Sequence, residues 1–349
     1  MKRRYWLIAA LIVLVGTVIY LNQTTTSSEQ PITIAGTIMG TSYHIKLVPL
    51  DEHIIDKKVM AGKISARLAT IDNEMSTYKK DSDISRFNRS SGGEWVPISA
   101  ETMTVVKTAQ EISGISQGAF DITVGKIVNL WGFGPTLSID AIPDAEDIQK
   151  LLSQSGYQKL GLRHTPPSIR KSDSAIFLDL SAIAKGYAVD AITNLLIENQ
   201  IENFLVEIGG EIVTHGHKNL QQQWVIGIES PVAEQRSVRK RLLLQDAAMA
   251  TSGDYRNFFE HNGVRYSHTI DPSTGYPVSH NLVSVTVIDS SCMRADALAT
   301  AIMVMGPEKG MHFAEQQQLA IFMLVKQNET YIEKYSTAFK PYLASVEEL

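Results

Sequence analysis

The sequence predicts an α+β fold, with mixed or antiparallel sheets and packed helices in a single domain. The first observation is that segments with strand and helix patterns are interspersed along the chain. The second is that several predicted strands follow one another without a helix between them, as at 203–216 and 320–335. A doubly wound parallel sheet needs a helical crossover between successive strands, so this order favours α+β.

The N-terminal segment predicts a membrane anchor. Three basic residues at 2–4 precede an uncharged apolar run of 17 residues at 5–21. This run is longer than the roughly 7–15 apolar residues of a cleaved signal and close to the roughly 17–25 of a spanning helix. We therefore expect an uncleaved anchor at 1–21, rather than a cleaved signal or a buried core helix, followed by a polar linker at 22–31. The domain at 32–349 would then lie in the periplasm, held at the inner membrane.

Composition narrows the possible partners and chemistry. The chain has 349 residues and a net charge of -5, so it offers no basic footprint for nucleic acid. Cys292 is the only cysteine. An intramolecular disulfide and a zinc site built from thiolates are therefore excluded.

Hydrophobic periodicity places the elements of the first half of the chain. A strand pattern at 32–48 is broken by Gly40, which predicts two short strands. Two helices are expected at 101–113 and 145–155, the second stopped by Gly156. Before them, apolar residues recur every three or four positions and predict another helix, at Ile64, Leu68, Ile71 and Met75.

The second half begins with a predicted strand at 175–180 and a helix at 181–200. A hairpin at 203–216 is expected to turn at the glycine pair 209–210. Residues 266–278 predict a strand that ends in a tight turn, and a helix surrounds Asp296. Further strands are expected at 224–229, 241–246, 282–289, 320–326 and 330–335.

Asp296 and Thr300 form the first candidate site. They stand four residues apart in an alanine-rich helix and therefore share one face. Carboxylate and hydroxyl oxygens are hard ligands, which suit Mg²⁺ better than zinc or copper. The spacing leaves a second interpretation open, in which Asp296 is a favourable charge in the first helical turn and Thr300 bonds back to its own helix.

The segment DLSAIAKGYAVD at 179–190 predicts a phosphate site. Asp179 closes the predicted strand, and Lys185 lies in the first turns of the next helix. The N–H groups and dipole at a helix N-terminus attract phosphate, and Lys185 adds positive charge. Neither a Walker A loop nor a dinucleotide-binding glycine motif is present at this position. A solvated lysine beside an N-terminal acidic residue is the alternative.

His268 is the third candidate. It is expected on the strand that ends in the tight turn containing Asp271. A histidine in this position can act as a general base near neutral pH. A structural role as a hydrogen-bond donor is the alternative.

Eight segments, taken together and in this order, resemble the ApbE family of FAD:protein FMN transferases. The resemblance implies an enzyme that binds FAD and Mg²⁺, cleaves the pyrophosphate, moves FMN onto a threonine of a partner protein and releases AMP. The segments run from Gly36 to Gly306 and read GTIMGTSY, MSTYKKDSDISRFN, GAFDITVG, DLSAIAKGYAVD, LVEIGGEI, SGDYRNF, YSHTIDPSTGYPV and MRADALATAIMVMG.

The resemblance also implies roles for single residues. The Mg²⁺ ligands would be Asp296, Thr300 and the main-chain carbonyl of Ala182. His268 would lie next to the reacting phosphate, where it or a nearby carboxylate could take the proton of the acceptor threonine. Asp271 would belong to the same catalytic group and could orient the histidine.

Other residues match positions that contact FAD in the family. Tyr78 and Phe120 would be aromatic neighbours of its rings, with core packing as the alternative for Phe120. The full set is Met39, Tyr78, Ala119, Phe120, Asp121, Asp179, Lys185 and Ile270.

By the same resemblance, the acceptors would be exported subunits of membrane redox complexes, of the NADH:quinone reductase or Rnf type. Two alternative functions also involve a bound flavin. In one, water is the acceptor and the chain is a Mg²⁺-dependent FAD pyrophosphatase that yields FMN and AMP. In the other, the chain is an exported flavin-binding module without catalysis.

Overall fold

The computed structural model describes residues 31–49, 55–134, 142–219, 222–231, 237–253, 258–261 and 264–343. The expected anchor at 1–21 lies outside the described residues, as does the linker up to residue 30, so both stay predictions. Within the described ranges, no helix combines the length and the apolar character needed to span a bilayer.

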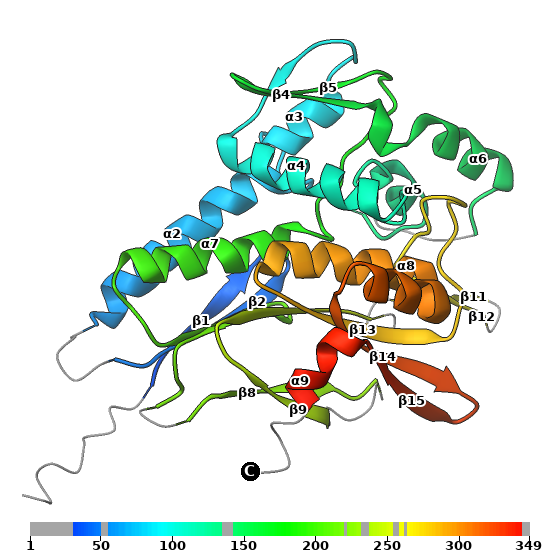
Figure 1. Cartoon of the computed structure of the whole chain (residues 1–349). Helices are drawn as coiled ribbons and strands as arrows, with labels where there is room; N and C mark the ends of the chain where they lie inside the picture. The colour runs from blue at the N-terminus through cyan, green and yellow to red at the C-terminus, as the bar shows by residue number, and fades with distance from the viewer. Residues whose placement is uncertain are drawn as a thin grey trace, which may run out of the picture.

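An eight-stranded sheet runs through the centre of the molecule (Figure 1). Each ladder between its neighbouring strands is antiparallel. In spatial order the strands are β1 (Ile32–Ile38), β2 (Thr41–Leu47), β6 (Phe204–Ile208), β7 (Glu211–His215), β10 (Ala247–Gly253), β13 (Leu282–Asp289), β14 (Ala320–Gln327) and β15 (Thr330–Tyr335).

Three helices cover one face of this sheet (Figure 1), namely α2 (Lys57–Met75), α7 (Ala184–Glu198) and α8 (Cys292–Gln316). The apolar stripe of α2 at 64, 68, 71 and 75 is buried, as its spacing predicts. α8 is interrupted at Gly306, which has a φ of 77° and precedes Pro307. Proline has no N–H to continue the helical hydrogen bonds, so a new helical segment begins there.

The opposite face of the sheet is covered by the hairpin of β8 (Trp224–Glu229) and β9 (Val238–Leu244) and by α9 (Lys340–Leu343) (Figure 1). A buried cluster joins Ile226 and Leu242 of this hairpin to Ile288 of the sheet. Strand β13 is therefore covered on both faces. Its residues are buried from Leu282 through Ile288 without the alternation of a half-exposed strand.

A smaller subassembly lies on the outer side of the helix layer (Figure 1). Its sheet has the order β3 (Val96–Pro97), β5 (Pro167–Lys171), β4 (Leu160–His164). Lys171 is fully buried there, and its Nζ donates to the carbonyls of Asn88, Ser174 and Ile176. The helices of this subassembly are α3 (Asp83–Arg89), α4 (Ala100–Ile115), α5 (Gly125–Leu130) and α6 (Ala145–Gln154).

The predicted α+β class with antiparallel sheets is confirmed. The predicted hairpin turns at its glycine pair, and the two strands expected on either side of Gly40 also pair as a hairpin. The strand expected at 175–180 is wrong, because only Phe177 forms a bridge there. The side-chain amide of Asn88 bonds both backbone groups of Leu178, at 2.7 and 2.9 Å, in place of a neighbouring strand. The following helix begins at Ala184 rather than at 181, since a turn precedes it.

Several short elements were not predicted. The strand expected at 241–246 spans 238–244, and an additional strand, β10, starts at Ala247. Strand β11 (Phe258–His261) was not predicted. The strand expected from residue 266 is β12 (Val264–Ser267), which ends before His268, so the placement of His268 on that strand is wrong. The other unpredicted elements are α3, α5, β3, β4, β5, α9 and two short 3-10 helices at Tyr157–Lys159 and Thr337–Phe339.

Candidate active site

Helices α7 and α8 meet at a point where only glycine fits. A Cβ atom on Gly186 would stand 2.4 Å from the carbonyl oxygen of Cys292 and 2.8 Å from the Cα atom of Met293. Both distances lie far below van der Waals contact, so the missing side chain is what allows the backbones to touch. This contact brings the start of α7 against the first turns of α8.

Asp190 fixes the two helices in register one turn further along α7. Its carboxylate accepts the backbone N–H groups of Cys292 at 2.8 Å and Met293 at 3.0 Å, and the Ser291 hydroxyl at 2.8 Å. Burial raises the pKa of Asp190, although these three donors oppose the rise. The bonds satisfy N–H groups that the first turn of α8 cannot pair itself.

Asp296 is 4% exposed, and its Oδ2 accepts the backbone N–H of Gly186 over 3.0 Å. It is not in the first turn of α8, which contains no acidic residue, so the interpretation as a first-turn charge is wrong. Thr300 lies one turn further, with its hydroxyl 3.2 Å from the Ser252 hydroxyl of β10. Carboxylate and hydroxyl oxygens thus gather between α7, α8 and the sheet.

Lys185 lies between two buried carboxylates. Its Nζ is 2.9 Å from Oε1 of Glu211 and 3.6 Å from Oδ2 of Asp296. Burial opposes the charge of Lys185, but the two carboxylates outweigh it and raise the pKa of the ammonium. The lysine side chain is 28% exposed and paired, so it is not the solvated lysine of the alternative interpretation.

Asp179 and Tyr78 lie on the side of the α7 N-terminus. The Asp179 carboxylate accepts the N–H of Ser181 at 2.8 Å, and its own N–H donates to Ile122 at 2.8 Å. Tyr78 is 69% exposed. Partial burial, and after it the charge of Asp179, raises the pKa of Tyr78. Tyr78 offers a large aromatic face to a ligand.

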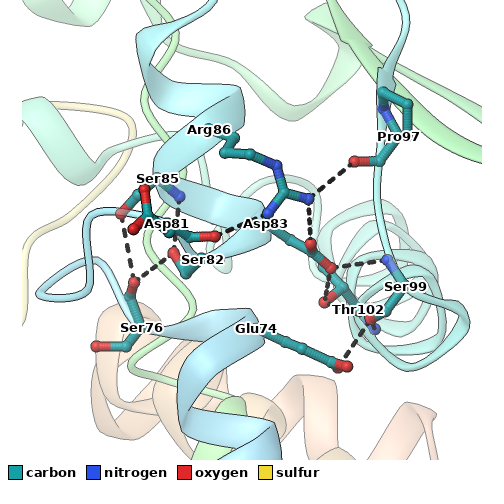
Figure 2. Close-up of polar contacts among 10 residues, drawn as sticks. All are labelled: Glu74, Ser76, Asp81, Ser82, Asp83, Ser85, Arg86, Pro97, Ser99 and Thr102. Atoms are coloured by element: carbon teal, nitrogen blue, oxygen red, sulfur yellow. Dashed lines mark hydrogen bonds and ion pairs between the residues drawn. The ribbon is translucent and has the colours of Figure 1, made fainter.

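The loop that carries Tyr78 is held by hydrogen bonds from α3 (Figure 2). The Ser82 hydroxyl, at the N-cap of α3, donates to the carbonyl of Ser76 at 2.7 Å. Asp83 then ties α3 to the start of α4 by accepting the N–H of Ser99 at 2.7 Å. The exposed tyrosine thus stands on an ordered support, which lowers the entropy lost when a ligand binds.

The segment Ala119–Asp121 follows α4. Phe120 is 2% exposed and belongs to the main core, so core packing is the role of its side chain. Asp121 accepts the N–H and the hydroxyl of Thr123 with one oxygen, and the N–H of Tyr157 with the other, at 2.7 to 2.8 Å. Both carboxylate oxygens of Asp121 therefore hold the protein's own loop.

Met39 forms the turn between β1 and β2 with a φ of 50°, which is uncommon for a residue with a side chain. Gly209, in the next hairpin, donates its N–H to the carbonyl of Ser42 at 3.0 Å. A Cβ atom on Gly209 would stand 3.3 Å from both Lys185 and Glu211. The turn at Gly209 therefore lies close to the ion pair of Lys185 and Glu211.

His268, Ile270 and Asp271 belong to a neighbouring cluster. The ring of His268 lies edge-on to Phe133, with centroids 6.2 Å apart, and Ile270 is buried against α5. One oxygen of Asp271 accepts the N–H and the hydroxyl of Ser273, at 2.8 and 2.7 Å. This carboxylate thus stabilises the tight turn, and its role in orienting His268 stays a prediction.

Three of the predicted residues meet at the junction of α7 and α8, namely Lys185, Asp296 and Thr300. Asp179 and Ala182 lie in the segment that leads into α7. Sequence reasoning missed four residues that build this junction. All four lie within segments that carry the family resemblance, but as single residues their only signal was a polar or small side chain in a mostly apolar segment. They are Gly186, Asp190, Glu211 and Ser252.

The residues at this junction fit a hard divalent cation. Asp296 supplies a buried carboxylate and Thr300 a hydroxyl on the same helix face, and Ala182 lies just before α7. Mg²⁺ needs few protein carboxylates, because water and phosphate oxygens complete its shell. Among the described residues, no group of three His, Cys, Asp or Glu side chains could hold a metal, and this donor set does not require one.

Known proteins match almost the whole chain. The model of the ApbE family matches residues 39–323. The FAD:protein FMN transferase of Vibrio cholerae is 43% identical over 98% of this chain and 99% of its own, and that of Escherichia coli is 35% identical over 92% and 91%.

Solved structures match as well. The flavin transferase ApbE from Vibrio cholerae superposes with a TM-score of 0.83 at 43% identity, covering 90% of this chain and 99% of that one. The apo Pseudomonas stutzeri flavinyl transferase ApbE has a TM-score of 0.83 at 38% identity, covering 90% and 98%.

The fold and the junction of α7 and α8, read with these relatives, define a flavin-transferring enzyme. The chain belongs to the ApbE family.

Proposed function

We propose that the chain transfers FMN from FAD to a threonine side chain of a partner protein, in a reaction that requires Mg²⁺ and releases AMP. The observation that carries the proposal is the buried Asp296 carboxylate, fixed to Gly186 and followed on the same helix face by Thr300. The names of the relatives support the reaction type, since they are FAD:protein FMN transferases.

Asp296, Thr300 and the Ala182 carbonyl would hold the cation. When bound, Mg²⁺ supplies neutralisation of the charge that develops on the phosphoryl oxygens. Lys185 adds a fixed positive charge at the start of α7, where helix N–H groups also favour phosphate. Together these groups orient the diphosphate of FAD.

The flavin end would lie along Tyr78, whose exposed ring offers a stacking face, and near the Met39 turn. Asp179, Ile270 and the backbone of Ala119–Asp121 complete the proposed FAD contacts. His268 takes the proton of the acceptor threonine, which makes the hydroxyl a better nucleophile. The threonine oxygen bonds to the FMN phosphorus as the diphosphate P–O bond breaks; the threonine proton passes to His268, and AMP leaves as the phosphate anion.

We further propose that the enzyme is anchored in the inner membrane by residues 1–21 and works in the periplasm. Its acceptors there would be exported subunits of NADH:quinone reductase or Rnf-type complexes. The motivation is the basic start and the apolar run of 17 residues at 5–21.

The test incubates the purified chain with FAD, MgCl₂ and an acceptor domain that contains a threonine. We expect a fluorescent acceptor band that survives denaturing electrophoresis, with AMP released in equal amount. AMP formed without acceptor would instead identify a pyrophosphatase, and FAD binding without either product would identify a binding module. An acceptor with its threonine changed to alanine is the control.

A further inference from the structure

Glu211 takes part in the site but has no place in the proposed reaction so far. It opens β7, directly after the turn at Gly209 and Gly210, and is 3% exposed. Its Oε1 lies 2.9 Å from Lys185 Nζ, whereas its Oε2 is buried without a hydrogen-bond partner among the described residues. A buried carboxylate with a single hydrogen-bond partner costs free energy, so its position beside Lys185 calls for an explanation.

The same ammonium faces a second buried carboxylate. Lys185 Nζ is 3.6 Å from Asp296 Oδ2, against 2.9 Å from Glu211. The side chains of Glu211 and Asp296 are 4% and 6% exposed, so water screens neither charge well. The shorter distance shows that Lys185 is bound by Glu211 and leaves Asp296 the more available of the two.

This arrangement matters because a lysine and a cation compete for a carboxylate. If Glu211 lost its charge, Asp296 would be the only carboxylate in contact with Lys185. The flexible lysine stem would then let the ammonium move the short distance onto Asp296. A metal ligand that is already paired with an ammonium binds a divalent cation less tightly.

We infer that Glu211 is a positioning residue that holds Lys185 away from Asp296 and so keeps Asp296 free for a divalent cation. The inference rests on the proposed function, because it assumes that Asp296 is a cation ligand. It gives a role to Glu211, which has no ligand contact and no reaction step in the proposed function. Glu211 acts through Lys185 and needs no contact with FAD.

The test measures binding of Mn²⁺ alone to the FAD-free protein, by the loss of the free-ion EPR signal. Mn²⁺ prefers the same oxygen ligands as Mg²⁺. Burial raises the pKa of Glu211 to about 7, with Lys185 opposing and Asp296 adding to the rise, so titrations at pH 8 keep the carboxylate mostly ionised. Glu211→Gln should raise the Mn²⁺ dissociation constant about tenfold, or about 1.4 kcal/mol.

The decisive comparison is a double-mutant cycle. Lys185→Met removes the competing ammonium, so it should not raise the dissociation constant, and Glu211→Gln should then have little further effect. A role of Glu211 in general stability would instead give additive losses. Should Glu211→Gln fold poorly, Lys185→Met alone still decides, because weaker Mn²⁺ binding in that variant would overturn the inference.

Glu308→Gln is the matched control. Glu308 pairs with Lys334 at 2.7 Å on the exposed surface, so this change removes a similar bond away from the site and should leave Mn²⁺ binding unchanged. Unchanged binding in Glu211→Gln, or additive effects in the cycle, would overturn the inference even where the wild type transfers flavin. A wild type that binds no Mn²⁺ would overturn the inference and the cation site together.

Discussion

Gly186 of α7 donates its backbone N–H to the carboxylate of Asp296 in α8 over 3.0 Å. One hydrogen bond thus fixes the proposed cation ligand to the helix that carries Lys185. Residues that are 110 positions apart in the chain meet at this bond. The following predictions test how the site depends on it.

Gly186→Ala should separate the two helices. The added methyl group would overlap the carbonyl oxygen of Cys292, so we expect a loss of about 1–3 kcal/mol in the free energy of unfolding and weaker flavin transfer. Gly62→Ala in α2 is the control, because a Cβ atom at that position would point into open space. That change should stabilise the helix by about 0.5–1 kcal/mol. For both variants, urea unfolding measures the free energy of unfolding and the acceptor assay measures flavin transfer.

Asp296→Asn should abolish most of the transfer while the fold is kept. The amide oxygen can still accept the N–H of Gly186, but the charge that would attract Mg²⁺ is gone. We expect transfer to fall on the order of a hundredfold or more, as when one electrostatic stabiliser of a transition state is removed. Circular dichroism checks the fold. Full activity with Mg²⁺ would reject the metal role of Asp296.

Asp190→Ala should loosen the start of α8. Loss of this acceptor leaves the N–H groups of Cys292 and Met293 and the hydroxyl of Ser291 without their partner, which costs about 1–3 kcal/mol. Transfer should fall as well, because the register of α7 and α8 holds Asp296. Asp56→Ala removes the N-cap of α2 and is the control, with a cost of about 1 kcal/mol and no change in transfer.

His268→Ala should slow the chemical step more than it weakens FAD binding. A general base contributes about 10²–10⁴-fold to rate, and its removal leaves the diphosphate contacts in place. Single-turnover transfer and FAD equilibrium dialysis separate the two quantities. Equal losses in rate and in affinity would identify His268 as a binding residue instead.

Lys171→Met should destabilise the outer subassembly by roughly 2–4 kcal/mol, because the carbonyls of Asn88, Ser174 and Ile176 lose their donor. Burial, with a smaller effect of Lys126, lowers the pKa of Lys171 from 10.5. The unfolded chain then binds more protons between the lowered pKa and 10.5, so wild-type stability gains from this group as pH rises through that window. The variant should lack that gain, and a variant with the same pH slope would contradict the assignment.

The local sequence pattern was enough to predict the fold class and most of the long helices and strands. The apolar spacing of α2, the glycine turns of the two hairpins and the alanine-rich α8 are each encoded within a few residues, so neighbours in sequence decide them. Short elements were not predicted, because a two-residue strand such as β3 is too short to show a periodic pattern. The strand predicted at 175–180 was wrong because the partner of this stretch is the side chain of Asn88, which lies 90 residues away from Leu178.

The sequence by itself determined which chemical groups are present: the carboxylate and hydroxyl on one face of α8, the lysine at the start of α7, and the order of motifs that resembles the ApbE family. Only the tertiary structure decided which groups meet. Glu211 reaches Lys185 because β7 runs beneath α7, and Gly186 reaches Asp296 because a missing side chain lets two backbones touch. Burial and charge pairing depend on these distances in space, which no local pattern of residues contains.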